Sequence, residues 1–136
     1  MVEIEIVYEG DLHTAASHGP SRATLATDAP KDNEGRGETF SPTDLLATAL
    51  GSCVLTTMGI VARRHGWPLE GGRARVEKHM VTGPGRRVAR LVVDLALPAA
   101  VPEEARPVLE RAAHTCPVHR SLHPDVHVEL RFGWSA

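Results

Sequence analysis

The chain has 136 residues, with 15 lysines and arginines against 17 aspartates and glutamates, and a formal net charge of −2. Its length is that of a single domain, and a composition of 42% hydrophobic and 24% charged residues excludes an intrinsically disordered chain. The near-neutral charge gives no general attraction to phosphate backbones or anionic lipid, so we expect neither nucleic acid nor membrane as a partner.

The amino-terminal sequence MVEIEIVYEG lacks the basic start, apolar stretch and small-residue cleavage site of a secretory signal, which predicts a cytoplasmic protein. The chain has two cysteines, Cys53 and Cys116. In a reducing compartment such a pair is more often catalytic, redox-active or simply buried than permanently bridged.

The first forty residues predict strands followed by a loop. Residues 2–10 place apolar side chains at Val2, Ile4, Ile6 and Tyr8 and acidic ones at Glu3, Glu5 and Glu9, which is typical of a strand with one solvated face. Residues 21–27 follow a Gly-Pro turn signal and are predicted to return as the hairpin partner of that strand. Residues 28–40 are polar, contain glycines and show no period, so we expect a loop, of a length often found at functional sites.

A long helix is predicted from Pro42 to His65. Ser41 is suited to the N-cap, and Asp44, three residues later, gives a short acidic version of the capping box. The helix is expected to end where a basic last turn gives way to Gly66.

The interior of this helix, residues 45–62, carries no charge and approaches the length of a membrane span. Threonine, serine and glycine dilute its hydrophobicity, and the rest of the chain has soluble patterns, so we predict a core helix buried on all sides. Gly51 and Gly59 each cost about 1 kcal/mol relative to alanine in a helix interior, which indicates that another backbone packs closely there. A partner helix or a second subunit would fit.

The remaining elements are predicted as a hairpin over 73–83 and 88–98, an amphipathic helix over 102–114 and a closing strand over 126–134. This order favours an α+β fold with an antiparallel sheet, in one domain over residues 1–136.

Cys53 lies near the middle of the predicted long helix, and one interpretation is a small buried hydrophobe, because free cysteine is among the most buried residue types. Cys116 differs, because basic residues surround it in the sequence: His114, His119, Arg120 and His123. Positive charge beside a thiol lowers its pKa and favours the thiolate.

Two other chemistries use the same residues. His114, Cys116, His119 and His123 offer nitrogen and sulfur donors for zinc, although their spacing matches none of the common zinc motifs. A Cys/His hydrolase or acyltransferase would need similar residue types, but neither cysteine lies in a nucleophile-elbow or papain-type sequence. We therefore expect no bound metal.

Two segments together resemble the OsmC/Ohr family: SPTDLLATALGSC, which ends at Cys53, and TCPVHRSL around Cys116. The order of the other elements also follows that family, so the resemblance covers nearly the whole chain. It implies an α+β fold in which antiparallel sheets wrap around two long central helices in an intertwined homodimer, with the sites at the subunit interface.

The resemblance also implies a cysteine-based peroxidase that reduces organic or related hydroperoxides. Cys53 would be the peroxidatic cysteine, whose thiolate is oxidised to sulfenic acid, and Cys116 the resolving cysteine, which condenses with it to a disulfide. An external thiol or dithiol would reduce that disulfide. No metal and no organic cofactor is implied.

A thiol among apolar side chains needs a positive partner to ionise. Family peroxidases supply an arginine held by a glutamate directly after the proline that opens the long helix; here that position is Thr43, and the acid is Asp44, one residue later. Arg36 and Arg22 are the candidate cations, and we prefer Arg36 because it lies closer in sequence to the helix start. The structural alternatives are a solvated loop charge for Arg36 and a helix-capping acid for Asp44.

The departure at Thr43 favours a second function. In that alternative the chain is a redox-responsive or small-ligand-binding OsmC-like protein that keeps the dimer and the cysteines without efficient peroxide turnover.

Overall fold

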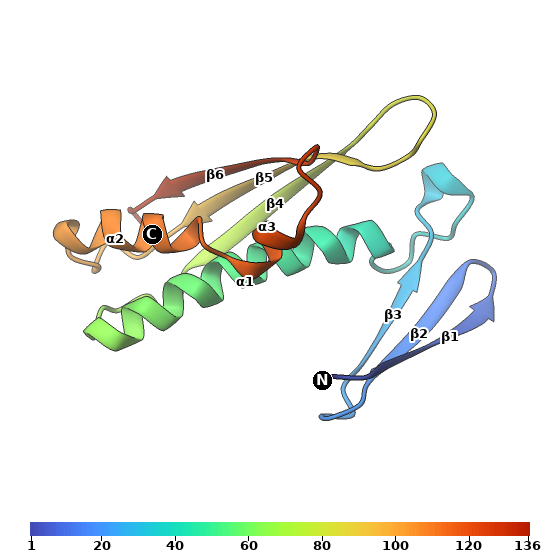
Figure 1. Ribbon diagram of the computed structural model, residues 1–136, viewed down its shortest axis with the longest axis horizontal. Helices are drawn as coiled ribbons and strands as arrows, with labels where there is room; N and C mark the ends of the chain where they lie inside the picture. The colour runs from blue at the N-terminus through green and yellow to red at the C-terminus, as the bar shows by residue number, and fades with distance from the viewer. The chain divides into compact units, whose positions relative to one another are not determined.

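The computed structural model describes all residues from 1 to 136, which divide into two compact units, Met1–Leu46 and Ala47–Ala136 (Figure 1). The first unit holds a three-stranded sheet, a loop and the start of the long helix. The second unit holds the rest of that helix, another three-stranded sheet and two short helices. This is the mixed α+β composition that the sequence predicts.

The first sheet is antiparallel, in the order β1-β2-β3, with β1 at Ile4–Gly10, β2 at His13–His18 and β3 at Thr24–Asp28. The predicted strands over 2–10 and 21–27 are confirmed as β1 and β3. Their predicted pairing is wrong, because β2 lies between them.

The sequence hides β2 because its turn and its composition are unusual. Asp11 and Leu12, between β1 and β2, have φ angles of 52° and 58°, so the hairpin turns through two left-handed residues. Leucine is rare in that conformation, and the short strand HTAASH has few β-branched or aromatic residues.

Helix α1 (Pro42–His65) has the predicted bounds. The Ser41 N–H donates to Asp44 Oδ2 at 2.9 Å, and the Asp44 N–H donates to Ser41 Oγ at 3.1 Å, so the predicted capping box is formed. The helix ends on a basic last turn, and Gly66 follows with a φ of 72°.

The second sheet has the order β4-β5-β6, with β4 at Arg73–Met80, β5 at Val88–Ala96 and β6 at His127–Gly133. The β4–β5 hairpin is antiparallel as predicted, but β5 and β6 are parallel, which corrects the expectation of a wholly antiparallel sheet. The segment 97–126 between them contains the short helices, and such a crossover returns the chain to the same end of the sheet.

Helix α1 packs closely against β4 in the second unit. A Cβ placed on Gly51 would lie 2.7 Å from Cγ2 of Val76, so the close neighbour at Gly51 is a strand side chain of this chain and not the backbone that the sequence predicts there. A Cβ on Gly59 would meet no atom within 4 Å, so this chain does not supply the close neighbour predicted there. The buried residues of α1 follow one side of the helix: Ala47, Leu50, Gly51, Val54, Met58 and Ala62.

By length and composition α1 could cross a membrane, with a hydropathy of 1.9, and core helices of soluble proteins pass the same test. Leu50, Val54 and Met58 are fully buried, which favours a core helix. The chain alone does not bury the helix on all sides as predicted, because Thr56 and Ile60 are exposed.

The predicted helix over 102–114 is present as the 3-10 turn η2 (Glu103–Ala105) and α2 (Arg106–Ala113). Leu109 and Ala113 bury the apolar side of α2. A further helix, α3 (Pro117–Ser121), lies in a segment for which the sequence predicts no helix or strand.

The outward side of the second sheet carries ion pairs. Arg90 on β5 forms an ion pair with Glu129 on β6 at 3.0 Å. Arg131, also on β6, contacts the same carboxylate at 2.8 Å. The Arg90 hydrogen bond, aided by Arg131, holds the pKa of Glu129 below its usual value. The charges on this surface are therefore paired with one another.

Candidate functional site

The fold brings the two cysteines together in the second unit. Cys53 is half-buried near the middle of α1, and Cys116 is fully buried directly before α3. Their side chains are hydrogen-bonded to each other, and both are free thiols. The two predicted catalytic residues thus influence each other's pKa.

Cys116 is positioned by the start of α3. It is the N-cap residue of that helix, and its Sγ accepts a hydrogen bond from the His119 N–H at 3.5 Å. Pro117 occupies the first helical position, where its missing N–H costs nothing. Cys116 therefore caps the helix as a serine commonly does, and this hydrogen bond fixes the direction of its side chain.

Several donors around Cys53 favour its thiolate. Burial alone would raise its pKa, but hydrogen bonds from the Cys116 thiol, the Val118 N–H and the Thr57 hydroxyl outweigh burial and lower the pKa below the usual value. The Thr57 Oγ1 lies 3.9 Å from Cys53 Sγ, one helical turn away on α1. Cys53 consequently ionises more readily than a free cysteine.

Cys116 is shifted in the opposite direction. Its pKa is raised, first by burial and then by its hydrogen bond to Cys53, and the backbone N–H groups of α3 compensate only in part. The site therefore holds an unequal pair, in which Cys53 is the sulfur that ionises and Cys116 is the thiol that donates to it. Such a pair supplies one nucleophile and one protonated neighbour for a later condensation.

Sequence reasoning missed the donors that distinguish the two thiols. Thr57 was visible as the residue four positions after Cys53, but the spacing alone does not show that its hydroxyl points at the sulfur. The N–H groups of Val118 and His119 became donors only because α3 forms. The Cys-Pro pair, suited to an N-cap and the first helical position, was the signal for that helix.

The predicted supporting residues lie in the first unit. Arg36 is an exposed residue of the loop between β3 and α1, flanked by Gly35 and Gly37. Asp44 forms the capping box with Ser41, so the helix-capping interpretation is confirmed. A role of Arg36 or Asp44 toward Cys53 stays a prediction.

The histidines near Cys116 do not form a metal site. No group of three or more histidines, cysteines, aspartates or glutamates in the chain is arranged to hold a metal ion. The His114 ring lies edge-on to Phe132, with 6.1 Å between centroids, and His123 Nδ1 accepts from the Asp125 N–H at 3.0 Å. This geometry gives the zinc alternative no support.

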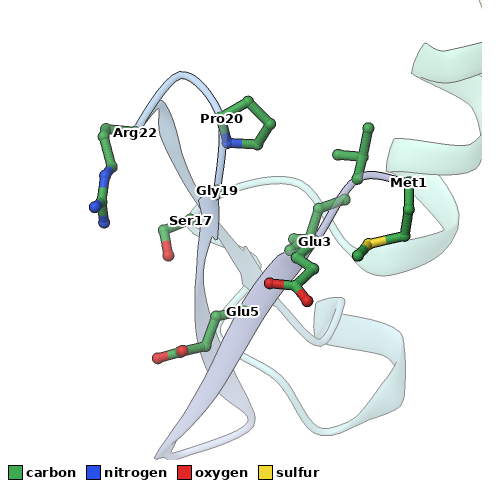
Figure 2. Close-up of a pocket in the computed structure, with 9 residues that line it drawn as sticks. Met1, Glu3, Glu5, Ser17, Gly19, Pro20 and Arg22 are labelled. Carbon is green, nitrogen blue, oxygen red and sulfur yellow. The ribbon is translucent and has the colours of Figure 1, made fainter.

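A pocket of about 900 Å³ opens on the first unit, beside the amino-terminal end of β1 (Figure 2). Figure 2 shows Glu3, Glu5, Ser17 and Arg22 among its lining residues. Arg22, the second candidate cation of the sequence analysis, lies here with a φ of 64°. The pocket contains no thiol, so it offers no nucleophile for peroxide chemistry.

A protein-family model described as OsmC-like protein matches residues 35–131, which include both cysteines. The structure is also similar to a Psychrobacter arcticus protein whose name assigns it to the osmotic-stress and detoxification response. The two share 41% sequence identity, with a TM-score of 0.91 over 98% of this chain and 96% of that one. No curated protein matches this chain.

Two more distant structures share the fold. One is an organic hydroperoxide resistance protein OsmC from Legionella pneumophila, with a TM-score of 0.78, 17% identity, and coverage of 98% of this chain and 96% of that one. The other is the organic hydroperoxide resistance protein OhrB of Bacillus subtilis, with a TM-score of 0.72, 15% identity, and coverage of 98% of each chain. These likenesses confirm the predicted α+β fold of the OsmC/Ohr type.

Proposed function

Because the chain belongs to the OsmC-like protein family, we propose that it is a thiol-dependent peroxidase that reduces organic or related hydroperoxides. The observation that carries this proposal is the hydrogen-bonded pair of Cys53 and Cys116, in which the pKa of Cys53 is lowered and that of Cys116 is raised. The names of the Legionella and Bacillus proteins, both organic hydroperoxide resistance proteins, agree with it.

In the first step the Cys53 thiolate attacks the terminal peroxide oxygen. The O–O bond breaks, an S–O bond forms, and the leaving alkoxide takes up a proton to become an alcohol. Cys53 is oxidised by two electrons to the sulfenic acid, and the hydroperoxide is reduced. The donors that stabilise the Cys53 thiolate raise the fraction of protein ready to react.

In the second step Cys116 attacks the sulfur of the Cys53 sulfenic acid. A disulfide forms and water leaves, with its second proton supplied by the Cys116 thiol. Two equivalents of an external thiol, or one of a dithiol, then reduce the disulfide and are themselves oxidised. This step is favoured because the two thiols already interact with one another before oxidation.

Arg36 and Asp44 are proposed as supporting residues, with Arg36 as the cation for the Cys53 thiolate and Asp44 as the acid that orients it. We further propose a cytoplasmic homodimer, whose second copy would cover the side of α1 that this chain leaves exposed around Ile60.

A redox-responsive or small-ligand-binding protein is the second candidate. Thr43 favours it, because this residue stands where family peroxidases have a glutamate. Such a protein would keep the thiol pair but would react with peroxide at the rate of an ordinary cysteine.

The test is the rate of Cys53 oxidation by an organic hydroperoxide and by hydrogen peroxide, followed by mass spectrometry of the Cys53 and Cys116 peptides. A peroxidase should react quickly and yield a disulfide between the two. Cys53→Ser should abolish peroxide consumption, whereas Cys116→Ser should consume one equivalent and stop. Peroxide turnover in Cys53→Ser, or oxidation of the wild type no faster than free cysteine, would reject the peroxidase and leave the second candidate.

A further inference from the structure

Asp28, the last residue of β3, is a buried carboxylate to which the proposed reaction assigns no role. It is only 1% exposed, although most of the neighbouring loop is open to solvent. A carboxylate so enclosed costs free energy unless it is paired and hydrogen-bonded. Its contacts therefore show what it holds in place.

The Asp28 side chain joins β2 to the loop that carries Arg36. His13 Nδ1 on β2 donates to Asp28 Oδ1 at 2.6 Å, and the Glu38 N–H in the loop donates to Asp28 Oδ2 at 3.1 Å. The backbone of Asp28 adds a third bond, from its N–H to the carbonyl of Phe40 at 3.0 Å. One residue thus closes the base of the loop from both sides.

The interior of the loop is equally constrained. The Gly37 N–H donates to the Ala29 carbonyl at 3.2 Å, and the Gly35 N–H donates to the Pro30 carbonyl at 3.0 Å. A Cβ on Gly35 would lie 1.8 Å from the Ala29 oxygen, and Gly37 has a φ of 60°. Glycine is required at Gly35 by this close approach and favoured at Gly37 by its φ, and the two hydrogen bonds hold the backbone on either side of Arg36.

His13 is itself held between two acids. Its Nε2 lies 3.5 Å from Glu9 Oε1, on the side of the ring opposite Asp28. The hydrogen bond from His13 is the main cause that holds the pKa of Asp28 below its usual value, and the charge of Arg36 adds to it. The negative charge of Asp28 is thus balanced by the groups that it positions.

From these contacts we propose that Asp28 and His13 are positioning residues, which hold the loop 29–40 in the conformation that presents Arg36 for the reaction. This inference rests on the proposed function, because Arg36 matters only if it supports the Cys53 thiolate. Neither residue touches the reacting atoms, so both act through the loop backbone.

The first measurement needs no enzymatic activity. Amide hydrogen exchange of the loop peptides is followed by mass spectrometry in wild type, in Asp28→Asn and in the control Glu34→Gln. The control removes an exposed loop carboxylate that takes no part in the Asp28–His13 contact. Asp28→Asn should exchange at least about tenfold faster around Glu38, because a hydrogen bond to a charged acceptor is stronger than one to a neutral amide. Glu34→Gln should match wild type. Unchanged exchange in Asp28→Asn would overturn the proposal.

The second measurement is the rate of Cys53 oxidation by an organic hydroperoxide. Asp28→Asn should slow it, and the double variant with Arg36→Ala should be no slower than Arg36→Ala alone, since both changes remove the same contribution. A loosened loop with wild-type oxidation in Asp28→Asn would overturn the positioning role. If wild-type Cys53 reacts no faster than free cysteine while Asp28→Asn still loosens the loop, the proposed function is rejected, but Asp28 still holds the loop.

His13 provides a second pair of variants if Asp28→Asn does not fold. The side-chain amide of asparagine places an N–H close to that of the imidazole Nδ1, so His13→Asn should retain the loop and the oxidation rate. His13→Ala should lose both. Equal exchange in these two variants would contradict the role of His13.

Discussion

The Cys116 thiol donates a hydrogen bond to Cys53, and this contact shifts the two thiols in opposite directions. It lowers the pKa of Cys53 because it stabilises the charged acceptor, and it raises the pKa of Cys116 because the donated proton is held. In the proposed reaction, the same interaction would both prepare Cys53 for attack and keep Cys116 available for condensation. The two roles assigned to the pair are therefore coupled by geometry.

This coupling predicts a difference between two variants that both prevent the disulfide. Cys116→Ser keeps an O–H donor, whereas Cys116→Ala removes it. The rate of Cys53 oxidation should rise with pH as the thiolate forms. In wild type the midpoint of this rise should lie below that of free cysteine, and in Cys116→Ser it should stay close to the wild-type midpoint. In Cys116→Ala the midpoint should move upward by about one to two pH units, because a hydrogen bond to a charged group contributes about 1.5–3 kcal/mol.

The midpoint can also be read without peroxide, from the ultraviolet absorbance of the thiolate. Cys53→Ser in each background is the control that removes the signal of interest. Identical midpoints in Cys116→Ser and Cys116→Ala would show that Cys116 does not act as the donor.

Thr57 offers a finer test of the same site. Thr57→Val is nearly isosteric and removes the hydroxyl 3.9 Å from Cys53 Sγ, so it should raise the midpoint of Cys53 ionisation by less than Cys116→Ala does. Thr56→Val is the matched control, because the Thr56 hydroxyl is exposed and donates to the Ser52 carbonyl. Both variants should be titrated side by side, and equal effects would mean that the change is one of helix stability.

Asp44 can be separated into a capping role and a catalytic one. Asp44→Asn keeps an oxygen that can accept from the Ser41 N–H and loses only the favourable interaction of a carboxylate with the helix N-terminus, so the free energy of unfolding should fall by less than about 1 kcal/mol. If Asp44 also orients the cation, Cys53 oxidation should slow severalfold at unchanged fold, as measured by stopped flow and thermal unfolding. An unaltered rate would leave Asp44 as a capping residue alone.

The sequence predicted the elements with strong local signals and missed those that depend on partners. The bounds of α1 follow from Ser41, Asp44 and Gly66, each of which acts within a few residues. β2 carries no comparable signal, because its turn runs through two left-handed residues and its strand has few β-branched or aromatic side chains. The parallel β5–β6 pairing carries none because it joins strands that are far apart in the sequence.

The candidate site divides in the same way. Both cysteines could be selected from their motifs, but the inequality between them depends on the Thr57 hydroxyl and on N–H groups presented by α3, which sequence spacing does not reveal. Asp28 and His13 lie 15 residues apart and gave no motif at all. Their relationship exists only because β2 and β3 pair in the register that sets His13 opposite Asp28.

The two glycines of α1 give a test of packing in which one helix provides both the variant and its control. Gly51→Ala places a methyl group 2.7 Å from Val76 Cγ2, so it should destabilise the protein by about 1–3 kcal/mol through overpacking. In Gly59→Ala the added Cβ meets no atom within 4 Å, and alanine has the higher helix propensity. For the isolated chain this substitution should therefore raise the free energy of unfolding by at most about 1 kcal/mol. Chemical denaturation measures both, and Val76→Ala should rescue Gly51→Ala by removing the clashing methyl. If Gly59→Ala instead destabilises the protein or lowers its oligomeric state, the close neighbour of Gly59 comes from a second copy, as proposed for the homodimer.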